Sequence, residues 1–80
     1  MKKDIREIIL REILSIDFNA IDIEARKWVD EYCTAGEYGL AYDTLLYENS
    51  MKKYKPSKES MNSLRKLEVL MEVEPGVWIE

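Results

Sequence analysis

The stretch that decides the fold of this 80-residue chain is Ile-Arg-Glu-Ile-Ile-Leu-Arg-Glu-Ile-Leu-Ser-Ile, residues 5–16. Its isoleucines recur at three- and four-residue steps, and charged side chains fill the opposite side. This is the period of an amphipathic α-helix, which we predict at about residues 3–15. Asp4 stands near its start, where a carboxylate suits the helix dipole. The rest of the chain must cover the apolar stripe of this helix.

The same periodicity continues downstream and predicts three further helices, at about 20–35, 37–49 and 58–72. We expect their inward-facing side chains to be Ile21, Ala25, Trp28, Val29 and Tyr32, then Leu40, Ala41, Thr44 and Leu45 with Tyr38 and Tyr47 as further candidates, and finally Met61, Leu64, Leu67 and Met71. Trp28 is predicted to be a core residue.

Residues that favour helix ends separate these segments. Asp17 and Asn19 are N-cap types ahead of the second helix, and Ser57 stands where it can cap the fourth. Gly36 follows the last periodic residue of the second helix and is expected to end it in the left-handed conformation. Gly39 is expected to allow close contact between helix backbones.

The last residues, Val77-Trp78-Ile79, are too few for a strand of their own and are expected to lie on the bundle and hide Trp78. The prediction is therefore an all-α fold: a single domain over residues 1–80, built as a small antiparallel bundle of about four helices with a short extended C-terminal tail.

The composition excludes several function classes. The chain has no His and one Cys, Cys33, which rules out a Ser-His-Asp triad, a Cys-His dyad, a His-ligated zinc site and an intramolecular disulfide. We expect no enzymatic activity, no metal site and no cofactor. The longest apolar run, residues 8–10, is too short for a signal peptide or a membrane span, so a cytoplasmic protein with no membrane partner is expected.

Charge is unevenly distributed. Residues 17–48 carry two basic and eight acidic side chains, a net charge of −6, while residues 49–66 carry six basic and one acidic, a net charge of +5. These blocks are either solvated helix faces or two surfaces of opposite sign. The overall charge of −4 favours a basic partner over nucleic acid. The basic run at Lys52, Lys53, Lys55 and Lys58 is interpreted as a solvated loop.

Tyrosines interleaved with carboxylates form the candidate binding residues. Tyrosine gives large, rigid contact area at interfaces, and acidic neighbours steer a basic partner toward it. The candidate partner-binding residues are Glu37, Tyr38, Tyr42, Asp43, Tyr47 and Glu48. The competing interpretation places these tyrosines at the edge of the core, with their hydroxyls in water.

The run Gly36-Glu37-Tyr38-Gly39-Leu40-Ala41, with the later Leu45, the Tyr47-Glu48 pair and a Ser-led helix from Ser57 to Met71, resembles the small bacterial immunity proteins of the MafI type. The resemblance covers about residues 20–75. In a protein of this family, the segment from Gly36 to Gly39 would either contact the partner or act as a structural hinge between two helices.

The resemblance implies a cytosolic antidote that binds and neutralises the toxic C-terminal domain of a polymorphic or contact-dependent inhibition toxin. Such domains are often nucleases, including RNases of the EndoU type. Binding could plug the active site of the toxin or block its substrate from beside it. The alternative is a helical adaptor, or a homodimerising regulatory module, unrelated to toxins.

Overall fold

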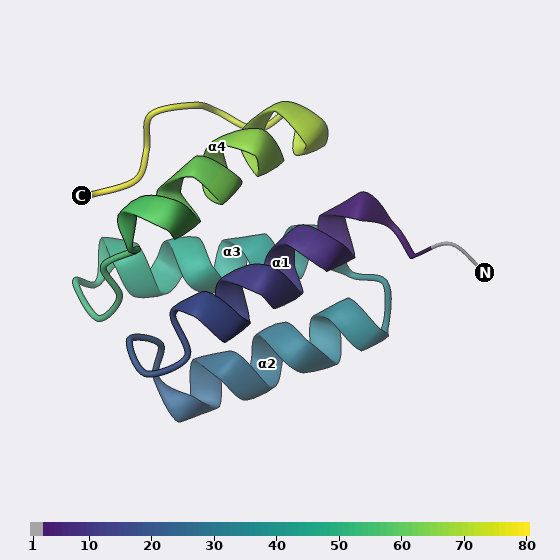
Figure 1. The fold of residues 1–80 in the computed structure, drawn as a ribbon, viewed down its shortest axis with the longest axis horizontal. Coiled ribbons are helices and arrows are strands. Elements are labelled where there is room, and N and C mark those ends of the chain that lie inside the picture. Colours follow the sequence, from purple (N-terminus) through teal and green to yellow (C-terminus); the bar gives the residue numbers. More distant parts are fainter. Residues whose placement is uncertain (1–2) are drawn as a thin grey trace.

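The computed structural model describes residues 3–80, and Met1 and Lys2 lie outside the described residues. The elements are α1 (Ile5–Ile16), α2 (Ile23–Thr34), α3 (Tyr38–Ser50) and α4 (Lys58–Met71). Successive helices run in alternating directions, and the C-terminal tail doubles back beside α4 (Figure 1). The predicted all-α bundle with an extended tail is therefore confirmed.

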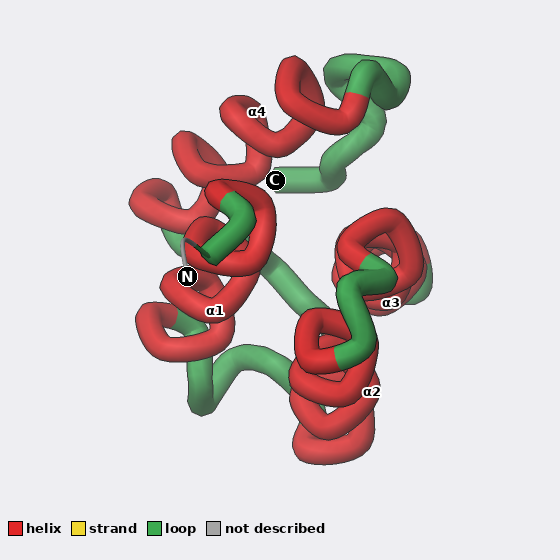
Figure 2. Tube along the Cα trace, turned by 90° about the vertical axis from the view of Figure 1, so that its right-hand side faces the viewer, coloured by secondary structure: helices red, strands yellow, loops and turns green. Residues whose placement is uncertain are grey.

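Two pairs of helices enclose the core. Viewed from the side, α1 and α4 lie on one side of the molecule and α2 and α3 on the other (Figure 2). Leu10 and Ile13 of α1 and Leu64 and Leu67 of α4 are fully buried between the pairs. From the other pair, Val29 and Cys33 of α2 and Ala41, Tyr42 and Leu45 of α3 complete the centre. The apolar stripe of each helix is thus covered by apolar side chains of other helices. This burial of apolar surface is the main contribution to the free energy that favours folding of a domain of this size.

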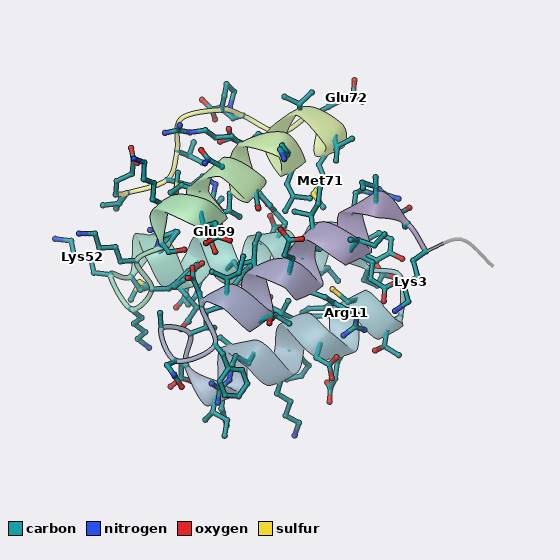
Figure 3. All side chains as sticks on the ribbon, viewed as in Figure 1. Lys3, Arg11, Lys52, Glu59, Met71 and Glu72 are labelled. Atoms are coloured by element: carbon teal, nitrogen blue, oxygen red, sulfur yellow. The ribbon has the colours of Figure 1, made fainter. Side chains whose placement is uncertain are left out.

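Arg11 links the two pairs at the surface. It projects from α1 toward α2 (Figure 3), where its Nη1 donates to Asp30 Oδ1 at 2.6 Å. Its Nε donates to Glu7 Oε2 at 2.8 Å, one turn earlier on α1. The guanidinium therefore orients α2 against α1, although pairs this exposed add little stability.

Local capping follows the sequence at three helix ends. Asp4 Oδ1 accepts a hydrogen bond from the backbone N–H of Arg6 at 2.9 Å, and Ser57 Oγ accepts one from the N–H of Ser60 at 3.1 Å. Gly36 ends the second helix with φ +76°, the left-handed conformation predicted for it.

The N-cap of the second helix was predicted at the wrong residue. The helix begins at Ile23, and Asp22 caps it by accepting from the N–H of Glu24 at 3.1 Å. Asp17 instead ends α1, where its own N–H donates to Ile13 O at 2.9 Å. Its carboxylate can be buried because it accepts hydrogen bonds from groups that are distant in the sequence.

Those donors come from the loop between α3 and α4. The Tyr54 hydroxyl donates to Asp17 Oδ2 at 2.6 Å, and the Ser57 N–H donates to the same oxygen at 3.1 Å. Tyr54 is itself buried, and burial together with the Asp17 carboxylate raises the pKa of its hydroxyl. The loop, which was expected to be solvated because of its lysines, is therefore anchored to the end of α1 through its tyrosine.

Trp28 is not a core residue, contrary to prediction: half of its surface is exposed, at 50%. The seam that α2 turns to the core consists of Ala25, Val29 and Cys33, which are four residues apart, and Trp28 lies about 100° around the helix from Val29. Leu40, also expected inside, is 46% exposed for the equivalent reason on α3. Gly39 is exposed as well, and a Cβ there would meet nothing within 4 Å, so it serves no close approach.

The tail hides Trp78, as expected. Its indole Nε1 donates to the Tyr42 hydroxyl at 3.0 Å, and the two rings meet edge to face with centroids 5.6 Å apart. The buried Asn49 holds the next residue, donating to Ile79 O at 2.7 Å and accepting from the Ile79 N–H at 2.8 Å. The tail is thus fastened to α3 at two successive residues.

Candidate partner-binding groove

A groove of about 850 Å³ runs between α2 and α3 and is called here the α2–α3 groove. It is lined by the turn before α2 and by one side of each helix. The lining residues are Asn19, Ala20, Ile21, Asp22, Glu24, Ala25, Trp28, Tyr32, Leu40, Asp43, Thr44, Tyr47, Glu48 and Lys53. This is the side of α2 and α3 on which apolar side chains are left uncovered.

One wall is aromatic. Trp28 and Tyr32 are one helical turn apart on α2 and stack with ring centroids 5.7 Å apart and an interplanar angle of 28°. The stack limits the rotamers of both rings, so little side-chain entropy remains to be lost on binding. Trp28 is half exposed, and Tyr32 is partly buried against the core. Large aromatic side chains at a surface are typical anchors of protein interfaces.

The other wall is a stripe of α3. Leu40, Asp43, Thr44 and Tyr47 recur at helical spacing and line the groove together. Tyr47 is 59% exposed, more than Trp28 or Leu40, the other large exposed hydrophobic side chains of the groove. The opposite face of α3 supplies Ala41, Tyr42 and Leu45 to the core. This helix is therefore apolar on two sides, of which the fold covers one.

The rim of the groove is acidic. Asp22 and Glu24 come from the start of α2, Asp43 and Glu48 come from α3, and Lys53 is the basic residue of the lining. Four carboxylates against one ammonium create a negative field around an apolar floor. A surface of this kind attracts a cationic side chain or a basic helix and then offers it aromatic contact.

The six residues predicted for binding separate into three groups. Asp43, Tyr47 and Glu48 lie in the groove. Glu37 is exposed at the N-cap position of α3 and lies outside the lining. Tyr38 and Tyr42 share a face of α3, as their spacing requires, but that face does not meet solvent in the groove.

Tyr38 packs on α1, where its hydroxyl donates to Glu7 Oε1 at 3.4 Å and the Arg6 guanidinium lies 4.9 Å from its ring centroid. Burial raises the pKa of the Tyr38 hydroxyl. Tyr42 is 1% exposed in the core, where its hydroxyl accepts from Trp78. The ring of Tyr42 is therefore covered in this structure, whereas Tyr38 is partly exposed beside α1.

Sequence reasoning missed Trp28 and Leu40 as surface contacts because each continues an apolar stripe. Tyr32 belongs to the same series of tyrosines interleaved with carboxylates, but it was placed among the inward-facing residues. A usable signal was nevertheless present. The apolar positions of residues 38–50 surround α3, whereas a helix covered on one side needs a stripe only about 100° wide. Apolar positions on more than one side of a helix indicate that the helix contacts another surface in addition to the core of its own domain.

The described residues, 3–80, contain no group of three or more His, Cys, Asp or Glu side chains placed to hold a metal ion. Cys33 is buried, and its burial raises the pKa of its thiol, so it is a packing residue and not an activated nucleophile. Among the helices from Ile5 to Met71, none combines the length and apolar character needed to cross a membrane.

Comparison with known proteins gives no matching family model, no matching curated protein and no matching solved structure.

Proposed function

We propose that this protein is an immunity protein, which binds and neutralises the toxic C-terminal domain of a bacterial polymorphic or contact-dependent inhibition toxin. The observation that carries the proposal is the α2–α3 groove, which combines an aromatic wall with an acidic rim. A nuclease domain, including one of the EndoU type, is the proposed partner because its nucleic-acid-binding surface must be basic.

The charge of the groove supports the first step of such an interaction. Carboxylates at the rim attract Lys and Arg side chains that would otherwise contact phosphates, and long-range attraction accelerates encounter. The Trp28–Tyr32 stack and Tyr47 supply the second step, in which apolar area is buried and dissociation slows. The toxin is then inactive because its substrate cannot reach the covered surface.

The resemblance to MafI-type immunity proteins supports the same proposal from the sequence. The Gly-Glu-Tyr-Gly-Leu-Ala run ends α2 and begins α3, so it positions the two helices that form the groove. Gly36 ends α2 with a positive φ, and Leu40 of the same run lines the groove. The run therefore combines the role of a hinge with one contact of the proposed interface.

The decisive experiment is protection. The proposal predicts a large toxin gene immediately upstream of the gene for this protein. The protein is co-expressed with the C-terminal domain that this gene would encode, and survival and complex formation are measured. We expect wild type to protect, and Trp28→Ala and Tyr47→Ala to lose protection through faster dissociation, each with a cost of about 2 kcal/mol or more in binding.

Phe18→Ala is the matched control. Phe18 is an exposed aromatic residue outside the groove, 54% exposed against 50% for Trp28. The Phe18→Ala variant should protect cells from the toxin domain as well as wild type does. Equal protection by all three variants would move the interface away from the groove, and absence of binding to the neighbouring toxin domain would reject the immunity function.

A further inference from the structure

A second uncovered surface lies on the opposite side of the molecule, between α1 and α4, and is called here the α1–α4 face. Its apolar residues are Ile5, Ile8 and Ile9 of α1 and Val69 and Leu70 of α4, which line a hollow of about 570 Å³. Val69 is 78% exposed, and Ile5, Ile8 and Leu70 are each about half exposed.

Ile9 is partly buried and packs against the core, but the fold leaves Ile5, Ile8, Val69 and Leu70 exposed. Leu10 and Ile13 of α1 and Leu64 and Leu67 of α4 form the stripes that meet the core. Ile5 and Ile8 continue the apolar period of α1 predicted from the sequence, yet the bundle leaves them open to water. A contiguous group of exposed aliphatic side chains on two adjacent helices is typical of an interaction surface.

Two charges border this apolar surface on opposite helices. Glu12 of α1 and Lys66 of α4 line the same hollow. Neither belongs to an ion pair within residues 3–80. The face therefore has an apolar centre, a negative group on its α1 side and a positive group on its α4 side.

We infer that the α1–α4 face binds a second copy of this chain. A two-fold axis along the hollow places α1 of each copy over α4 of the other, because α1 and α4 lie side by side in the face (Figure 2). Ile5 and Ile8 then meet Val69 and Leu70 of the other copy. The same rotation brings Glu12 of each copy to the side that carries Lys66 of the other, so the face is complementary to itself in both apolar character and charge.

The composition of the face suits a symmetric dimer. A standard interface buries about 800 Å² on each partner, with a desolvated apolar centre and a polar rim. The exposed side chains of Ile5, Ile8, Val69 and Leu70, with the partly buried Ile9 between them, supply the centre, and Glu12 and Lys66 supply its charged border. Because α2 and α3 lie on the other side of the molecule (Figure 2), the α2–α3 groove stays open in this dimer. The inference therefore does not depend on what binds there.

The first test is the oligomeric state, measured by sedimentation equilibrium over a range of protein concentrations. Wild type should dimerise, and Val69→Glu should raise the dissociation constant of the dimer by about tenfold or more, because a carboxylate would be desolvated among aliphatic side chains. The exposure of Val69 means that this variant keeps its fold, which circular dichroism checks.

Ile23→Glu is the matched control, since Ile23 is also a β-branched residue exposed on a helix, at 69%, but lies on α2. It should dimerise as wild type does. A wild-type protein that is monomeric at every concentration would overturn the inference. A dimer weakened by Ile23→Glu and not by Val69→Glu would overturn it as well.

A mixing experiment tests the pairing of charges. Glu12→Lys alone places two lysines opposite each other at both contacts of the dimer, and Lys66→Glu alone places two glutamates there. Each variant should therefore dimerise less than wild type. When the two variants are mixed, every contact pairs Lys with Glu, and a mixed dimer should form in preference to either homodimer. Failure of the mixture to restore dimerisation would contradict the proposed axis.

Discussion

At the scale of single residues, Asp17 joins parts of the chain that are distant in sequence. Its carboxylate accepts hydrogen bonds from Tyr54 and Ser57 while its backbone ends α1. A buried carboxylate is costly unless it is hydrogen-bonded, and a donor that loses it is left unsatisfied. Asp17 is therefore a structural residue within the acidic block of residues 17–48, and it does not line the α2–α3 groove.

We expect Asp17→Ala to lower the free energy of unfolding by about 1–3 kcal/mol at neutral pH, because the buried Tyr54 hydroxyl loses its acceptor. Urea denaturation measures the change, and a double-mutant cycle with Tyr54→Phe isolates the pair. Asp43→Ala is the control, since Asp43 is exposed, and should change stability by less than about 0.5 kcal/mol. Equal effects of the two alanine variants would contradict this role of Asp17.

The pH dependence of stability follows from the same site. Burial by itself would raise the pKa of Asp17, but the hydrogen bonds from Tyr54 and Ser57 outweigh it and hold the pKa below its usual range. Such a carboxyl stabilises the fold fully above its unfolded pKa of about 3.9, and the contribution is lost as pH falls through the lower folded value. The stability difference between wild type and Asp17→Ala should therefore shrink in acid. A difference that stays constant from about pH 7 to pH 2 would reject this linkage.

Trp28 has the opposite character, because half of its surface is already in water. We expect Trp28→Ala to cost about 1 kcal/mol of stability, whereas Leu45→Ala, at a fully buried position, should cost about 2–5 kcal/mol. Thermal and urea unfolding of the two variants compare them directly. If Trp28→Ala proved as destabilising as Leu45→Ala, the indole would be a core residue, and the assignment of Trp28 to the surface of the groove would be wrong.

At the scale of elements, the tail and the α3–α4 loop behave as parts of the bundle. Asn49, near the end of α3, donates to Tyr54 O of the loop at 3.1 Å and also holds Ile79 of the tail. One buried amide thus satisfies backbone groups of two irregular segments. This is the reason that segments without helical periodicity still have defined positions.

The contribution of the tail can be measured at Trp78. Trp78→Ala should cost about 3–5 kcal/mol, because it removes a buried indole, its edge-to-face contact and its hydrogen bond to Tyr42. Ile79→Ala keeps the backbone bonds to Asn49 and removes a half-exposed side chain, so its cost should be much smaller. Urea unfolding compares the two. Similar midpoints for Trp78→Ala and wild type would show that the tail is not part of the cooperative unit.

At the scale of the whole molecule, the distribution of charge matters more than the net value of −4. The acidic rim of the α2–α3 groove contains four carboxylates, whereas the exposed lysines Lys52 and Lys55 lie in the loop outside the groove lining. At ordinary ionic strength, salt largely screens the attraction between exposed charges that are more than about 8–10 Å apart. Association rates should therefore respond to the carboxylates of the rim.

Reversal of charge in the rim tests this. If the proposed toxin domain is the partner, Asp43→Lys together with Glu48→Lys should slow its association and reduce the salt sensitivity of the association rate, while the dissociation rate changes less. Lys52→Glu together with Lys55→Glu is the control and should have the smaller effect. Kinetics at two salt concentrations provide the measurement. If the lysine reversals abolished binding and the acidic reversals did nothing, the recognition surface would lie on the loop.

The sequence by itself determined the helical class, the number of helices and several of their ends. These features are local: the three- and four-residue apolar period specifies a helix, and Asp4, Gly36 and Ser57 act on backbone groups within a few residues of themselves. The covering of Trp78 could also be predicted, because laying the short apolar segment on the bundle removes its indole from water.

Only the tertiary structure decided which apolar side chains are covered. Periodicity defines a face about 100° wide but not the side from which a neighbouring helix covers it. Trp28, Leu40, Ile8 and Val69 stayed exposed for this reason, while Tyr42 was buried. The burial of Asp17 by Tyr54 joins residues 37 positions apart, a pairing that no local pattern contains. The α2–α3 groove likewise exists only because α2 and α3 are packed at this rotation, and its position could not be derived from either helix alone.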